Sequence, residues 1–102
     1  MKYMSENPLK VLEKIDLKLM QSIDGSRDLA FAEGVLPKRV KFLVAMALDA
    51  AEGSETGVKS LALRAVQEGA TNQEIGEILR IVKYICGAGS MYTAARGLKD
   101  II

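Results

Sequence analysis

Few side chains in this chain of 102 residues could do acid–base or nucleophilic chemistry, because it contains no histidine and one cysteine. Histidine is the usual general base near neutral pH and the commonest metal ligand. Asp49 and Glu52 lie three positions apart, and paired carboxyl groups can do acid–base work when one pKa is raised. Cys86 is a candidate one-cysteine nucleophile. These three residues are the candidate catalytic residues.

Each candidate also has a structural interpretation, which stays open. Asp49 and Glu52 can be surface charges at a helix end, and Cys86 can be a small buried hydrophobic residue. A second group of cationic and phenolic side chains could hold a carboxylate substrate or donate a proton, although such side chains on amphipathic helices usually reach solvent. This group comprises Lys59, Lys83, Tyr84, Tyr92 and Arg96.

The composition argues against several classes of function. Fourteen Lys and Arg against 13 Asp and Glu give a net charge of +1, so we expect no nucleic-acid partner. With one cysteine and no histidine, we predict no metal site and no cofactor. The segment MKYMSENPLK has no hydrophobic signal core, and no apolar run approaches the roughly 18 residues of a membrane span. We therefore expect a protein of the cytoplasm without membrane contact. An unpaired cysteine is ordinary in that reducing compartment.

The N-terminal third carries signals for two helices. Asn7 followed by Pro8 predicts the cap and first position of a helix that runs to about Ile23 and ends at Asp24-Gly25. Ser26 predicts the cap of a short second helix over residues 27–33. Residues 1–6 are expected to fray. The side chains expected to face inward are Leu9, Leu12, Ile15, Leu19, Ile23, Leu29 and Phe31.

A central helix is predicted from Leu36-Pro37 to about Glu52. Its segment VKFLVAMAL, residues 40–48, is apolar on nearly every side, which is typical of a helix buried all round. A domain this small has few elements to cover such a helix. We therefore favour a homo-oligomer, while a helix wrapped entirely by its own domain remains the alternative.

Residues 53–77 read GSETGVKSLALRAVQEGATNQEIGE and predict two helices around a tight turn. Gly69 stands where a left-handed residue ends the first helix, and Thr71 with Glu74 forms a capping box for the second. A run of small residues at 87–89 then predicts a break, with Ser90 as the cap of a last helix. No segment alternates as a strand does, so the fold class is all-α with about six helices.

The pattern Ala65-x-x-x-Gly69-Ala70-Thr71-x-x-Glu74-Ile75 resembles the signature of the carboxymuconolactone decarboxylase and alkylhydroperoxidase D superfamily. The resemblance runs from about Leu36 to the C terminus. It implies a single domain over residues 1–102, with N-terminal helices in 1–35 and the family core in 36–102. It also implies a homo-oligomer, a trimer or a hexamer, and a small organic acid as the expected ligand.

The residues that perform the chemistry of this superfamily are missing. In the alkylhydroperoxidase D branch, a C-x-x-C pair reduces peroxide with the help of a histidine and a relay glutamate, and the lactone decarboxylase branch keeps that histidine. The register of the signature puts the cysteines at Ser54 and Gly57, the histidine at Leu61 and the glutamate at Phe42. None of these side chains can replace a thiolate and its base. A two-cysteine peroxidase mechanism is therefore excluded.

Three functional hypotheses follow. The preferred one is a divergent, oligomeric protein that binds a small ligand or serves as an accessory subunit. The second is a cofactor-free, decarboxylase-type enzyme that acts on small carboxylic acids or lactones through Asp49 and Glu52. The third is a weak one-cysteine antioxidant that uses Cys86. The sequence leaves open whether the protein is an enzyme.

Overall fold

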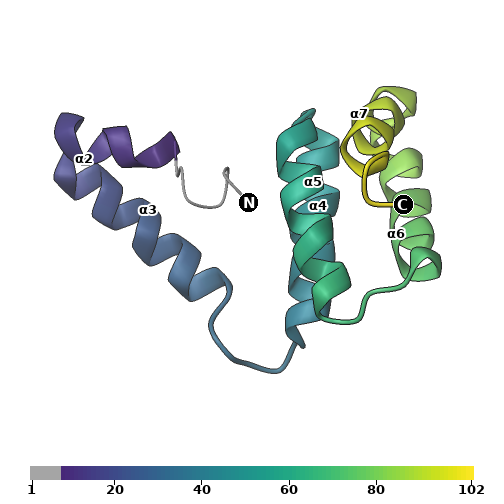
Figure 1. Cartoon of the computed structure of the whole chain (residues 1–102), viewed down its shortest axis with the longest axis horizontal. Helices are drawn as coiled ribbons and strands as arrows, with labels where there is room; N and C mark the ends of the chain where they lie inside the picture. Colours follow the sequence, from purple (N-terminus) through teal and green to yellow (C-terminus); the bar gives the residue numbers. More distant parts are fainter. Residues whose placement is uncertain (1–7) are drawn as a thin grey trace. The chain divides into compact units, whose positions relative to one another are not determined.

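The computed structural model describes residues 8–102, and within them it is all-α, with six α-helices, one short 3-10 helix and no strand (Figure 1). The elements are η1 (Pro8–Lys10), α2 (Val11–Ile15), α3 (Leu17–Ala30), α4 (Lys38–Glu52), α5 (Glu55–Gln67), α6 (Asn72–Cys86) and α7 (Ala88–Leu98). The predicted fold class is confirmed. The chain divides into two compact units, one that ends at Ala32 and a C-terminal unit over Glu33–Ile102.

The helix break in the N-terminal unit lies at Asp16, and the predicted break at Asp24-Gly25 is wrong. Asp16 is extended, with φ −159° and ψ 98°, and its carboxylate accepts a hydrogen bond from the Leu19 amide at 3.1 Å, which caps α3. The helix then continues through Gly25, because one interior glycine costs only about 1 kcal/mol. Arg27 pairs with Asp24 at 3.4 Å across this turn. The predicted cap at Ser26 is therefore wrong as well.

The predicted inward face of the N-terminal unit is largely wrong. Met20 is the buried residue of its described part, whereas Leu9, Ile15, Leu19 and Leu29 are exposed. Leu12, Ile23 and Phe31 are half-buried. Two short helices offer too little partner surface to enclose a continuous apolar stripe. The predictions for Asn7 and for residues 1–6 lie outside the described residues.

The C-terminal unit has one hydrophobic core, to which all four of its helices contribute. α4 and α5 lie side by side, α7 packs against α5, and α6 contacts both α4 and α7 (Figure 1). Met46 of α4 and Val58 of α5 are the largest fully buried side chains. A Cβ on Gly97 would lie 2.7 Å from Val58 Cβ, so glycine allows the close crossing of α7 over α5. The buried core comprises Leu43, Met46, Ala50, Val58, Ala62, Ala65, Ile75, Val82, Ala94 and Leu98.

Within the C-terminal unit, the central helix α4 keeps part of its apolar surface exposed. Pro37 precedes its first residue as the N-cap, one position outside the helix that was predicted to contain it. Leu43, Met46 and Ala50 face the core, whereas 48% of Val44 and 61% of Leu48 are exposed. The C-terminal unit by itself therefore does not wrap this helix on every side.

The turn between α5 and α6 confirms the predicted capping chemistry. Gly69 has φ 96°, in the left-handed region that only glycine adopts without strain. The Thr71 hydroxyl accepts a hydrogen bond from the Glu74 amide at 3.1 Å, and the Glu74 carboxylate accepts one from the Thr71 amide at 2.9 Å. The second oxygen of Glu74 accepts a hydrogen bond from Arg39 Nε at 3.2 Å. One carboxylate therefore ties the start of α6 to the first turn of α4.

Candidate functional site

The turn between α4 and α5 positions the first candidate carboxyl, that of Asp49. Gly53 ends α4 with φ 85°, and its amide donates a hydrogen bond to the Ala50 carbonyl at 3.3 Å. The Ser54 amide donates to the Asp49 carbonyl at 2.9 Å, and the Ser54 hydroxyl accepts from the Gly57 amide at 3.2 Å. These contacts fold α5 back along α4 and bring the Asp49 side chain to the first turn of α5.

The carboxyl group of Asp49 occupies the space that a side chain at position 57 would need. A Cβ placed on Gly57 would lie 2.6 Å from Asp49 Cγ and 2.7 Å from Ser54 Oγ, and it would overlap Asp49 Oδ2. Real Cβ atoms do not approach other atoms this closely, so residue 57 has to be glycine while Asp49 keeps this position. This is one of the two positions where the family resemblance expects a cysteine.

The environment of Asp49 favours its protonated form. Burial removes water from the carboxyl and raises its pKa above the ordinary value of 3.8, and the negative charge of Glu52 raises it further. The side chain forms no hydrogen bond with another residue in the described part of the chain. Because a carboxyl with a raised pKa stays protonated to higher pH than an exposed aspartate, Asp49 is a candidate general acid.

The other two positions that the resemblance assigns to chemistry hold structural side chains. Phe42 is half-buried, and the guanidinium carbon of Arg64 lies 5.8 Å from its ring centroid, a cation–π contact. Leu61 is half-buried and packs against the core. Apolar packing thus replaces the proton relay of the peroxidase branch at both positions.

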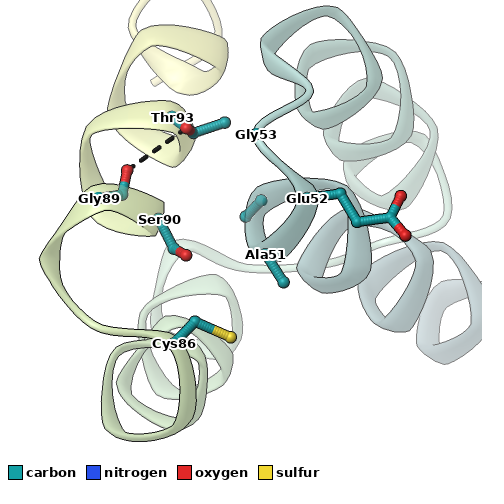
Figure 2. A pocket seen from close by; sticks show the side chains of 8 residues that line it. Ala51, Glu52, Gly53, Cys86, Gly89, Ser90 and Thr93 are labelled. Atoms are coloured by element: carbon teal, nitrogen blue, oxygen red, sulfur yellow. Dashed lines mark hydrogen bonds between the residues drawn. The ribbon is translucent and has the colours of Figure 1, made fainter.

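A separate open pocket of about 250 Å³ lies between the C-terminal end of α4 and the junction of α6 with α7 (Figure 2). It brings together two of the candidate residues, Glu52 and Cys86. The Cys86 thiol points into the space between the helices, whereas the Glu52 carboxylate points away from it (Figure 2). The lining residues are Ala50, Ala51, Glu52, Gly53, Cys86, Gly89, Ser90 and Thr93.

The three candidate residues therefore do not form one site. Asp49 faces α5, while Glu52 and Cys86 belong to the pocket beside α7. Cys86 is exposed, so its interpretation as a buried hydrophobic residue is wrong, because the helix ends there and leaves the thiol at the mouth of a pocket. The roles proposed for these residues stay predictions.

Two hydroxyl residues of this pocket had no place among the predicted site residues. Ser90 was expected to cap α7, but Gly87 holds the cap position and Ser90 lies within the first turn. Ser90 and Thr93 are 7% and 8% exposed, and the Thr93 hydroxyl donates to the Gly89 carbonyl at 3.4 Å. The signal that could have found them is their spacing, because residues three or four apart share a helix face, and this face also holds the buried Ala94.

The cationic and phenolic side chains lie elsewhere. Lys59 pairs with Asp100 at 3.6 Å, and Arg96 pairs with Glu55 at 3.5 Å, so both tie α5 to the C-terminal end of the chain. Tyr84 and Tyr92 are exposed, and Lys83 and Tyr84 line a different surface hollow together with Arg80. None of these five side chains lines the pocket beside α7.

Within residues 8–102, no group of three or more Cys, Asp or Glu side chains is arranged to hold a metal ion. In the same part of the chain, no helix has the length and apolar character to cross a membrane.

Comparisons with known proteins bear on the family. The protein-family model described as "Carboxymuconolactone decarboxylase family" matches residues 18–100 of this chain. The apo structure of lpg0406, a carboxymuconolactone decarboxylase family protein from Legionella pneumophila, is similar with a TM-score of 0.79 and 29% sequence identity, over 90% of this chain and 82% of that chain. No curated protein matches the sequence. The family match begins within α3, farther toward the N terminus than the predicted Leu36.

Proposed function

The chain belongs to the carboxymuconolactone decarboxylase family, and on that basis we propose that it is a homo-oligomeric member that binds a small ligand or serves as an accessory subunit, without thiol peroxidase chemistry. We further propose that it acts in the cytoplasm, where a single unpaired cysteine is ordinary.

The main support for this proposal is the contact between Asp49 and Gly57. A C-x-x-C peroxidase needs a thiol at position 57, and here the Asp49 carboxyl fills the space of that side chain. Because the chain has one cysteine and no histidine, the remaining thiol has neither a resolving partner nor an imidazole base. A ligand role at the pocket of about 250 Å³ requires none of these groups.

The exposed apolar side chains of α4 and α6 support the homo-oligomer. Val44 and Leu48 lie one turn apart on α4, and Ile81 and Ile85 lie one turn apart on α6. These four side chains are between 48% and 71% exposed in the single chain. Exposed apolar side chains that gather on a helix face mark interaction sites, and a second copy of the chain is the proposed partner. A trimer or a hexamer is the expected assembly.

A second candidate function is a cofactor-free enzyme for small carboxylic acids or lactones. The observation that favours it is the raised pKa of Asp49, which burial causes and Glu52 increases. In such an enzyme Asp49 would protonate the carbanion or enolate that decarboxylation leaves. If Asp49→Asn and Glu52→Gln left every detected turnover unchanged, this candidate would be excluded.

A third candidate, a weak antioxidant, depends on Cys86 alone. Its thiol is exposed in the pocket and could be oxidised, but the chain supplies no second cysteine to reduce it again. Unchanged peroxide consumption in Cys86→Ser would exclude this role.

Native mass spectrometry of gently purified protein tests the proposed function. It reports the subunit number and any retained small molecule in one measurement. An oligomer with a stoichiometric extra mass is the expected result, and the chemistry of that mass would separate a binder from an enzyme. A monomer would contradict the proposed assembly. An oligomer that retains and binds no small molecule would contradict the ligand role and leave an accessory role.

A further inference from the structure

We propose that the pocket between α4 and α7 binds a small carboxylic acid that also carries a hydroxyl or amino hydrogen-bond donor. The carboxylate would lie at the N-terminus of α7 on the Ser90 hydroxyl, and the donor would face the end of α4. This inference deepens the proposed function, because it names the ligand class and the residues of the ligand site.

The first wall of the pocket is the N-terminal turn of α7. This helix has 11 residues, its N-cap is Gly87, and no side chain caps its first amides. No acidic residue lies in its first turn. The leading amides of a helix have no partner within the helix and together carry a partial positive charge. Gly89 and Ser90, which line the pocket, both belong to this turn.

The Ser90 hydroxyl is the second and independent indication of a ligand. Ser90 is only 7% exposed, and it forms no side-chain hydrogen bond with another described residue. No fully buried side-chain oxygen or nitrogen in the described chain lacks a partner, so the Ser90 oxygen keeps its access to the pocket. Its side chain points into the space between α7 and α4 (Figure 2). A largely buried hydroxyl without a hydrogen-bond partner carries a desolvation cost, and a ligand that bonds to it in that space would relieve this cost.

The neighbouring hydroxyl differs in this respect. Thr93 donates its proton to the Gly89 carbonyl at 3.4 Å, so it offers lone pairs to the pocket but no free proton. Ser90 is therefore the hydroxyl that can donate to an anion, together with the amides beside it.

The opposite wall of the pocket favours a ligand that carries a hydrogen-bond donor as its second polar group. It is the C-terminal end of α4, with Ala50, Ala51, Glu52 and Gly53. The last carbonyls of a helix carry a partial negative charge, and they accept hydrogen bonds from cations and neutral donors. The Ala50 carbonyl already accepts from the Gly53 amide at 3.3 Å, so a donor on the ligand would pair with the carbonyls of residues 51–53. A hydroxy acid or an amino acid satisfies both walls, and about 250 Å³ limits it to a small one.

The test is a titration of the full-length, isotope-labelled protein with lactate, followed by the backbone amide signals. We expect saturable shifts centred on Gly89 and Ser90, and weaker binding of acetate, which lacks the donor. Ser90→Ala should weaken lactate binding about tenfold, as expected for one hydrogen bond to a charged group. Ser60→Ala, a half-buried serine of α5 outside the pocket, should bind as the wild type does.

A second variant covers the case in which water replaces the lost hydroxyl. Ala51→Glu adds a negative charge to an exposed position that lines the pocket, and it should abolish lactate binding without loss of the fold. The proposal is overturned if lactate causes no saturable shift, or if Ser90→Ala and Ala51→Glu both bind it as the wild type does. A retained molecule that both variants still hold would overturn this site but keep the proposed function. Failure to bind any small molecule would overturn the ligand role together with this site.

Discussion

Gly57, in the first turn of α5, determines whether a thiol can stand beside Asp49. Gly57 has no Cβ, and the carboxyl of Asp49 lies where that atom would be. Burial removes water from this carboxyl and raises the pKa of Asp49, and the negative charge of Glu52 raises it further. Gly57 therefore leaves position 57 without a thiol and leaves room for the Asp49 carboxyl.

Gly57→Ala is expected to destabilise the protein by about 1–3 kcal/mol, the usual cost of overpacking. The reason is the overlap of the new methyl group with the Asp49 carboxyl. Urea unfolding of the full chain measures the effect. Gly76→Ala is the matched control, because a Cβ there meets no atom within 4 Å, and it should stabilise α6 by roughly 0.5–1 kcal/mol.

The double variant Asp49→Ala/Gly57→Ala separates this overlap from helix propensity. Removal of the carboxyl makes room for the methyl group, so the double variant should be more stable than the sum of the single changes predicts. Additive effects would contradict the contact described between Asp49 and Gly57.

The raised pKa of Asp49 gives a pH dependence with a definite sign. Above the ordinary value of 3.8, the folded protein keeps a proton on Asp49 that the unfolded chain has released. The folded state binds more protons in this window, so the contribution of Asp49 to stability falls as pH rises through it. Asp49→Asn removes the titrating carboxyl, so the variant does not lose this contribution to stability as the pH rises.

Relative to the wild type, Asp49→Asn should therefore gain stability as the pH rises from 3.8 through the raised pKa of Asp49. Urea unfolding at a series of pH values measures the difference. Glu77→Gln, at an exposed position of α6, serves as the control and should show no comparable trend. A constant difference between Asp49→Asn and the wild type would argue against the raised pKa.

At the scale of the elements, side-chain caps determine where α5 and α6 begin. Thr71 and Glu74 begin α6, and Ser54 begins α5, each through a hydroxyl that accepts an amide hydrogen bond. Glu74 also accepts from Arg39 of α4 at 3.2 Å. The start of α6 is thus held both by its own cap and by a contact with the helix beside it.

Thr71→Ala should cost about 1 kcal/mol of stability, the usual value for the loss of an N-cap hydroxyl. Thermal unfolding measures this loss. Thr56→Ala is the control, since Thr56 is exposed within α5 and forms no side-chain hydrogen bond with the described residues. Equal stability of the two variants would mean that the cap at Thr71 contributes nothing.

The caps also show which parts of the fold could be predicted from sequence. The signals at Gly69, Thr71 and Glu74 are local, since each residue interacts within one turn, and the structure confirms them. Gly25 and Ser26 gave equally local signals for a helix end, yet α3 continues through both. There the cap at Asp16 had already started a helix that one glycine could not stop.

The site was less predictable, because its geometry comes from contacts between helices. Asp49 and Glu52 were recognised as a carboxyl pair, but the sequence gives no sign that they face different neighbours. The space at Gly57 exists only because α5 folds back on α4, and the pocket at Ser90 only because α7 meets the end of α4. Sequence spacing specifies a helix face but not what lies opposite it.

At the scale of the whole molecule, the exposed apolar side chains matter most. Val44 and Leu48 of α4, with Ile81 and Ile85 of α6, stay exposed in the single chain. Complete burial of an apolar side chain of this size yields roughly 1.5–3 kcal/mol, and these side chains have about half to two-thirds of their surface left to bury. Burial of this surface would favour the proposed assembly.

Leu48→Glu and Ile81→Glu are each expected to shift the proposed trimer or hexamer toward smaller species. A charge in a dry interface has no partner and is costly to desolvate. Light scattering coupled to size exclusion measures the mass. Gln67→Glu adds the same charge to an exposed position at the end of α5 and should leave the assembly unchanged. An unchanged mass in both variants would exclude these faces from the interface.

The contact between Asp49 and Gly57 also restricts how this protein can evolve. A single codon change can turn glycine into cysteine, but the new side chain would collide with the Asp49 carboxyl and cost stability. A cysteine at position 57 therefore requires the Asp49 side chain to turn away or to be replaced by a smaller one. A path that replaces Asp49 first avoids this collision.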